Sequence, residues 1–145
     1  MSVEELCTVR VGRVYSQTPE RVFDAWLDPA AAGCFLFATP AGEMTHVEID
    51  GRAGGRFLIV ERRAGEEVEH RGEYMAIERP RRLAFRFTVP KYSPLSTDVA
   101  LEFEAAGAGC ALTLIHTGVL PEWAASTEEG WRGILEGLAK VLEEN

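Results

Sequence analysis

The length, composition and charge of the chain exclude several classes of protein. With 145 residues the chain has the size of one domain, which we expect to span residues 1–145 and to fold without disulfides or metals. Its 15 basic and 23 acidic residues give a net charge of −8, which disfavours binding to nucleic acids and to anionic membranes.

The sequence also gives an expectation about location. The longest stretch without charged side chains, residues 105–121, is too short and too polar to cross a bilayer. The acidic opening of the chain does not resemble a secretion signal, and the three cysteines form an odd, widely spaced set. We therefore expect a cytoplasmic protein with reduced thiols.

The first third of the chain predicts a strand followed by two short helices. Residues 7–16 alternate with a period of two, as in a strand with one dry face. Thr18 followed by Pro19 favours a helix start, because the hydroxyl caps the helix and proline suits its first position. Asp28 precedes a proline, so we expect it to end this helix and to cap a second one that stops at Gly33.

The central part of the chain, from residue 44 to residue 118, has a strand-like period. Turn residues divide it into six runs, and alternation gives each run one apolar face. Consecutive antiparallel hairpins and a single curved sheet follow from this order. The six predicted strands are residues 44–50, 55–63, 68–77, 83–89, 97–104 and 110–117.

The C-terminal stretch returns to a helical period, and its apolar side chains share one face. Ser126 and Glu129 have the spacing of a capping box at its start. Gly130, Gly133 and Gly137 each weaken a helix, so we expect sheet backbone or a ligand to approach that face closely. The order of elements predicts an α+β fold in which a strongly bent antiparallel sheet wraps a long C-terminal helix. The apolar positions are Trp131, Ile134, Leu135, Leu138, Val141 and Leu142.

No motif for a cofactor, a metal or a catalytic nucleophile is evident, so we predict no cofactor and no catalytic residue. His46, His70 and His116 lie on three different predicted strands, each without a second closely spaced ligand, which argues against a metal site. His70 and His116 share a face with apolar neighbours and are expected to point inward. Such an imidazole is either a hydrogen-bonded group of the core, or a contact that orients a ligand or moves a proton.

The aromatic side chains fall mostly on predicted inward faces. They either pack as a solid core or, because a bent sheet and one helix do not close completely, line a cavity for a small molecule. The second interpretation predicts a pocket between the sheet and the C-terminal helix. Its expected lining residues are Trp26, Phe35, Phe57, His70, Tyr74, Phe85, Phe87, Leu114, His116, Trp131 and Leu135.

Five segments in this order resemble the START-like, helix-grip superfamily, also called SRPBCC. Within it the chain is similar to the branch named for the activator of the ninety-kilodalton heat-shock protein ATPase. This chain has Phe35 and Cys110 where the branch usually has tryptophan and threonine, which alters the shape of the pocket. The segments that carry the resemblance are residues 18–29, 50–57, 72–83, 112–118 and 130–138.

The resemblance implies a β-α-α-β6-α domain whose sheet grips the last helix around an apolar pocket. Across the superfamily such pockets hold lipids, sterols, polyketides and plant hormones. We therefore predict a binding protein for a small apolar or amphipathic molecule. An enzyme of the polyketide cyclase type, with His116 and Tyr74 moving protons, is one alternative. A module that interacts with a chaperone is another, and a homodimer is a further possible partnership.

Overall fold

The computed structural model describes residues 6–143 and confirms the predicted order of elements. Seven strands and three helices form an α+β helix-grip fold, with one additional turn of 3-10 helix before the last helix. The elements in chain order are β1 (Cys7–Tyr15), α1 (Pro19–Leu27), α2 (Pro29–Phe35), β2 (Glu43–Ile49), β3 (Arg56–Arg63), β4 (Glu66–Glu78), β5 (Arg82–Thr88), β6 (Thr97–Ala106), β7 (Gly109–Val119), η1 (Pro121–Trp123) and α3 (Ala124–Glu143).

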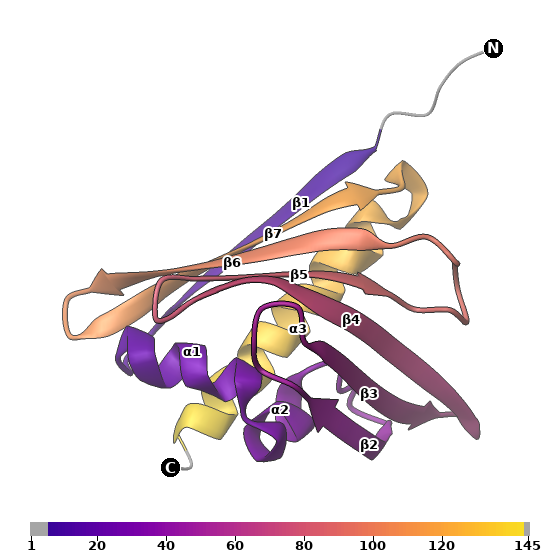
Figure 1. Ribbon diagram of the computed structural model, residues 1–145, viewed down its shortest axis with the longest axis horizontal. Coiled ribbons are helices and arrows are strands. Elements are labelled where there is room, and N and C mark those ends of the chain that lie inside the picture. Colours follow the sequence, from indigo (N-terminus) through magenta and orange to yellow (C-terminus); the bar gives the residue numbers. More distant parts are fainter. Residues whose placement is uncertain (1–5, 144–145) are drawn as a thin grey trace.

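The seven strands form one antiparallel sheet with the order β1-β7-β6-β5-β4-β3-β2. The register shifts in β1, β2 and β4, and such irregularities increase the local twist and bend of a strand. The curved sheet lies across α3, and α1 and α2 lie on the same side of the sheet as α3 (Figure 1). The predicted curved sheet and its helical partner are therefore confirmed.

The two predicted N-terminal helix caps are both present. The Thr18 hydroxyl accepts a hydrogen bond from the backbone N–H of Arg21 at 3.3 Å, and an Asp28 carboxylate oxygen accepts one from Ala30 at 3.1 Å. The prediction that Gly33 ends α2 is wrong, because the helix continues to Phe35. A Cβ at Gly33 would lie 3.2 Å from Val47, so the glycine allows close packing of α2 on β2.

The start of α3 also differs from the prediction. The helix begins at Ala124 rather than after Ser126, and the preceding 3-10 turn delivers the chain to it. The Ser126 hydroxyl lies within the first turn and donates to the carbonyl oxygen of Trp123 at 3.1 Å. Ser126 thus lies inside the helix rather than at its N-cap position, so the predicted capping box is absent.

The glycines of α3 do not have the close neighbours that we expected. A Cβ at Gly130 or at Gly133 would have nothing within 4 Å, so neither sheet backbone nor another element approaches there. Only Gly137 is close to a neighbour, and that neighbour is α2, since its Cβ would lie 3.3 Å from the Cβ of Phe35. The expected approach of sheet backbone is thus not found at Gly130 and Gly133, and the alternative, approach of a ligand, stays a prediction there.

The core lies between the concave face of the sheet and the three helices. Trp26 and Phe35 pack edge to face with ring centroids 5.2 Å apart, and both are fully buried. The hydroxyl of Tyr15 donates to the carbonyl oxygen of Leu135 at 2.8 Å, which ties β1 to α3. Within residues 6–143, no helix combines the length and the apolar character that crossing a membrane requires.

Candidate functional site

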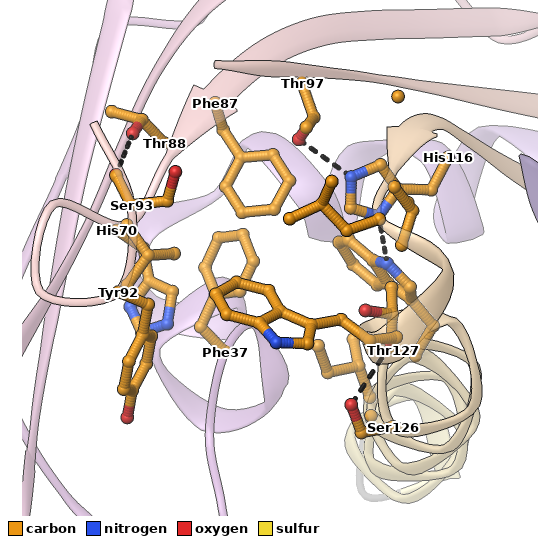
Figure 2. A pocket seen from close by; sticks show the side chains of 18 of the residues that line it. Phe37, His70, Phe87, Thr88, Tyr92, Ser93, Thr97, His116, Ser126 and Thr127 are labelled. Carbon is orange, nitrogen blue, oxygen red and sulfur yellow. Dashed lines mark hydrogen bonds between the residues drawn. The ribbon is translucent and has the colours of Figure 1, made fainter. Parts of the chain in front are cut away.

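A cavity of about 510 Å³ lies between the sheet and the first half of α3 (Figure 2). Four parts of the chain enclose it: the segment after α2, the end of β3 with the middle of β4, the loop between β5 and β6, and the stretch from the end of β7 into α3. Its volume suits a small organic molecule, since ligand cavities commonly measure about 300 to 1,000 Å³.

Three aromatic side chains form the centre of the cavity wall. The ring of Phe37 lies 5.5 Å from that of Phe87 and 5.8 Å from that of Trp131, measured between centroids. Phe87 and Trp131 are 6.2 Å apart and nearly perpendicular. Rings at these distances attract one another, so the wall is stiff and apolar.

Exposed apolar side chains surround the opening of the cavity. Tyr92 and Leu95, on the β5–β6 loop, are 53% and 68% exposed, and Trp123 of η1 is 42% exposed. These three are half of the six large apolar side chains that are exposed within residues 6–143. Apolar surface concentrated at one opening is typical of a ligand-binding or interaction site.

His116 occupies one side of the cavity in a defined protonation state. Its Nδ1 lies 3.0 Å from the indole N–H of Trp131, and its Nε2 lies 2.8 Å from the Thr97 hydroxyl (Figure 2). Burial lowers the pKa of His116 to about 4, against a weaker opposing effect of Asp98. The imidazole is therefore neutral at physiological pH.

His70 occupies the opposite side of the aromatic wall (Figure 2). Its ring stacks on Phe37 with centroids 4.3 Å apart and planes 8° apart. Nδ1 lies 3.2 Å from the Ile59 carbonyl oxygen and Nε2 lies 3.4 Å from Arg63 Nη2, so Nδ1 carries the hydrogen and Nε2 accepts. Burial and the charge of Arg63 lower the pKa of His70 to about 4.

A partly buried ion pair between Glu61 and Arg63 holds the segment after α2 against the sheet. Glu61 is 1% exposed and accepts hydrogen bonds from the side chain of Arg63 and from the N–H and hydroxyl of Thr39. A Cβ at Gly42 would overlap the Glu61 carboxylate at 2.2 Å, so only glycine fits there. Because both charges are paired and hydrogen-bonded, the cavity contains a cation, Arg63, that is already neutralised.

Phe37 has a left-handed backbone, with a φ of 59°, which is uncommon for a bulky residue. Its carbonyl oxygen accepts a hydrogen bond from Arg63 Nη2 at 3.2 Å, and its ring is held between His70 and Trp131. Such a conformation persists only where the surroundings enforce it, and it is frequent at ligand sites. The Glu61–Arg63 pair thus positions the aromatic ring at the centre of the cavity.

The structure brings four of the expected pocket residues together in the cavity wall: His70, Phe87, His116 and Trp131. The other seven do not line this cavity. Phe35 lines a second hollow of about 470 Å³ between α2 and the C-terminal half of α3. The remaining six are buried in the core: Trp26, Phe57, Tyr74, Phe85, Leu114 and Leu135.

Sequence reasoning did not select several residues that line the cavity. Phe37 has no sequence feature that separates it from the other aromatic residues. The residues around Thr97 and Arg63 likewise give no indication that these two side chains line a cavity. The exposed side chains Tyr92 and Leu95 had a usable signal, because two large apolar residues lie in a loop with two prolines. Loops that carry apolar residues in water commonly have a function.

The polar groups of the cavity do not form a metal site or a nucleophile with its base. No group of three or more His, Cys, Asp or Glu side chains within residues 6–143 is placed to hold a metal ion. Both buried imidazoles have both ring nitrogens occupied by hydrogen bonds within the protein. The arrangement can enclose an apolar molecule and offer it a small number of oriented hydrogen bonds.

The sequence profile of the family described as Activator of Hsp90 ATPase homolog 1-like protein matches residues 16–143. The chain belongs to this family. The helix-grip fold described above is that of the START-like superfamily, to which Activator of Hsp90 ATPase homolog 1-like proteins are related. No curated protein sequence matches this member of the family.

Solved structures show the same fold at low sequence identity. Protein CV1439 from Chromobacterium violaceum is 24% identical, with a TM-score of 0.85 over 94% of this chain and 96% of its own. An AHSA1-like protein from Aeromonas hydrophila is 21% identical, with a TM-score of 0.83 over 95% and 93% of the two chains. SA2116 from Staphylococcus aureus, described as a protein of unknown function, is 16% identical, with a TM-score of 0.86 over 97% and 96%.

Proposed function

We propose that this family member binds a small apolar or amphipathic molecule in the cavity between the sheet and α3. The observation that carries the proposal is an aromatic-walled cavity of about 510 Å³ whose opening is surrounded by exposed apolar side chains. Leaving Tyr92, Leu95 and Trp123 in water is unfavourable, and a ligand entering between them reduces that cost.

The electrostatics of the cavity support an uncharged ligand body. Both histidines on its walls are neutral, because burial lowers the pKa of each to about 4. The only cation of the lining, Arg63, is paired with the buried Glu61 carboxylate. The net charge of −8 further disfavours a strongly anionic partner.

A substitution that fills the cavity tests the proposal directly. Gly130 lines the cavity, and a Cβ added there has nothing within 4 Å, so Gly130→Leu adds bulk at the cavity wall without a clash at its Cβ. Gly133→Leu is the matched control, because Gly133 is on the same helix, is equally open and lines only the second hollow.

The probe is the neutral fluorescent hydrocarbon diphenylhexatriene, titrated into the wild type and both variants. We expect the wild type and Gly133→Leu to bind it with similar affinity, and Gly130→Leu to lose about tenfold or more in affinity, since roughly 1.4 kcal/mol corresponds to a factor of ten. Native mass spectrometry of freshly purified protein would detect a co-purifying molecule. Equal binding by wild type and Gly130→Leu would refute the proposed site.

The cyclase alternative has less support from the geometry. Tyr74 packs against Phe57 and Phe85 in the core and is not part of the cavity lining, and both nitrogens of His116 are already engaged. An interaction with a chaperone rests on the family description alone. We therefore place ligand binding first.

A further inference from the structure

Trp131, His116 and Thr97 form a chain of hydrogen bonds at the cavity wall, and the donor and acceptor of the first bond, from Trp131 to His116, are fixed by chemistry. The indole nitrogen of Trp131 lies 3.0 Å from His116 Nδ1. An indole N–H donates and cannot accept, so Nδ1 of His116 must carry a lone pair and no hydrogen. Trp131 is 3% exposed and His116 is 5% exposed, so water does not offer either group an alternative partner.

The second step follows from the first. A neutral imidazole whose Nδ1 is unprotonated carries its hydrogen on Nε2. His116 Nε2 lies 2.8 Å from the Thr97 hydroxyl, and the N–H therefore donates to the threonine oxygen. Protonating His116 would put a hydrogen on Nδ1 facing the indole N–H, and the pKa of about 4 that results from burial is consistent with a neutral ring.

The third step leaves a donor without a partner. Because the Thr97 oxygen accepts from His116, its own hydrogen is directed elsewhere, and within residues 6–143 it donates no hydrogen bond. Thr97 is the first residue of β6, pairs with Phe87 of β5 and lines the cavity. The Thr97 hydroxyl thus offers a hydrogen at the cavity wall beside the ring of Phe87.

We infer that the cavity selects flat apolar molecules that carry a carbonyl oxygen, and that the Thr97 hydroxyl donates a hydrogen bond to this oxygen. His116 and Trp131 are positioning residues, since they orient the threonine rather than contact the oxygen. The inference rests on the proposed function and specifies its ligand class. The rings of Phe37, Phe87 and Trp131 would contact the flat body of the ligand.

The two buried imidazoles favour an acceptor over a donor on the ligand. All four ring nitrogens of the two buried histidines are used within the protein, so a ligand hydroxyl or amine would find no imidazole acceptor for its hydrogen. A buried donor left without a partner costs about 1 to 3 kcal/mol, whereas a carbonyl oxygen beside Thr97 is paired with the threonine hydroxyl.

Two neutral probes of nearly equal shape test the inference: acetylnaphthalene, a ketone, and ethylnaphthalene, a hydrocarbon, both substituted at the same ring position. Dissociation constants are measured from the shift of the Trp131 indole signal in proton–nitrogen NMR spectra. We expect the wild type to bind the ketone about fivefold more tightly than the hydrocarbon, the value expected for one net hydrogen bond.

Substitutions at Thr97 then locate the source of that preference. Thr97→Val removes the hydroxyl at constant shape, and we expect the ratio of the two dissociation constants to fall to about one. Thr97→Ser retains the hydroxyl and should retain the preference. A ratio that is unchanged in Thr97→Val would overturn the inference, as would a wild type that binds the two probes equally.

The outcomes also separate this inference from the proposed function. If both probes bind with the same affinity and Gly130→Leu excludes both, the ligand site stands and only the role of Thr97 fails. If neither probe binds to the wild type, the proposed function and the inference both fail. Long-range proton–nitrogen correlation of the His116 ring gives an independent check, because it must show hydrogen on Nε2 and none on Nδ1.

Discussion

The two halves of α3 face the same sheet, yet one half is packed and the other borders a cavity. The C-terminal half is covered by α1 and α2, and Leu138 is 0% exposed among the core side chains. The N-terminal half borders the cavity, which the β5–β6 loop and Trp123 of η1 also line, and Ile134 and Trp131 belong to the same lining. The apolar face of a helix therefore does not by itself distinguish a solid core from a binding site. The segments that pack around each half of the helix decide between the two.

The largest difference between the halves should appear when one apolar side chain is removed from each. Leu138→Ala leaves a void in the packed half, and we expect a loss of about 4 kcal/mol in the free energy of unfolding. Ile134→Ala enlarges an existing cavity, so we expect less than half of that loss. Urea denaturation at neutral pH measures both, and equal losses would mean that the two halves are packed alike.

Acidification should act on the half that contains the cavity, because both buried histidines of residues 6–143 line it. Their folded pKa of about 4 lies below the unfolded value of 6.5, so the unfolded chain takes up more protons as the pH falls. Their contribution to stability is complete above pH 6.5 and is lost as the pH falls toward 4.

Between pH 6.5 and pH 5 this linkage should lower the free energy of unfolding by roughly 3 kcal/mol for the two histidines together. Urea denaturation across this interval measures the slope. His116→Gln removes one of the two titrating groups and should reduce the slope by about half. A stability that is constant over this interval would show that neither imidazole is kept neutral by burial.

The smallest expected effect comes from the glycines of α3. Gly130→Ala places a methyl group where nothing lies within 4 Å, so the gain in helix propensity of about 1 kcal/mol should appear in full. Gly137→Ala brings a methyl group within 3.3 Å of the Cβ of Phe35, which should cancel that gain. Thermal unfolding compares the two variants. An equal rise in melting temperature would show that α2 shifts away from the added methyl group at little cost in free energy.

Local patterns were reliable for the elements and for the direction of single side chains. Alternation in the last strand predicted that His116 points inward with Leu114, and both are buried. The caps at Thr18 and Asp28 were also predictable, because each depends on residues within three positions in sequence. The start of α3 was not, because the 3-10 turn at Pro121 displaces the helix start from Ser126 to Ala124.

The members of the candidate site were predictable only in part. Inward direction and aromatic character put Phe85 and Phe87 in the same class, although Phe85 is 2% exposed in the core and only Phe87 lines the cavity. Thr97 joins His116 across a separation of 19 residues, and no local pattern reports such a contact. The left-handed backbone of Phe37 depends on a hydrogen bond from Arg63, which is 26 residues away.

The sequence by itself determined the order of the elements, the inward direction of His70 and His116 and the family, because these depend on short-range periodicity and on segments that can be compared one at a time. Only the tertiary structure decided where the core ends and the cavity begins. That boundary depends on where α1, α2 and the β5–β6 loop cover the sheet, and it arises from packing between segments distant in sequence. The direction of the hydrogen bonds from Trp131 to Thr97 also depends on tertiary packing. The position of the hydrogen on the His116 ring is fixed only when α3, β7 and β6 bring these side chains together.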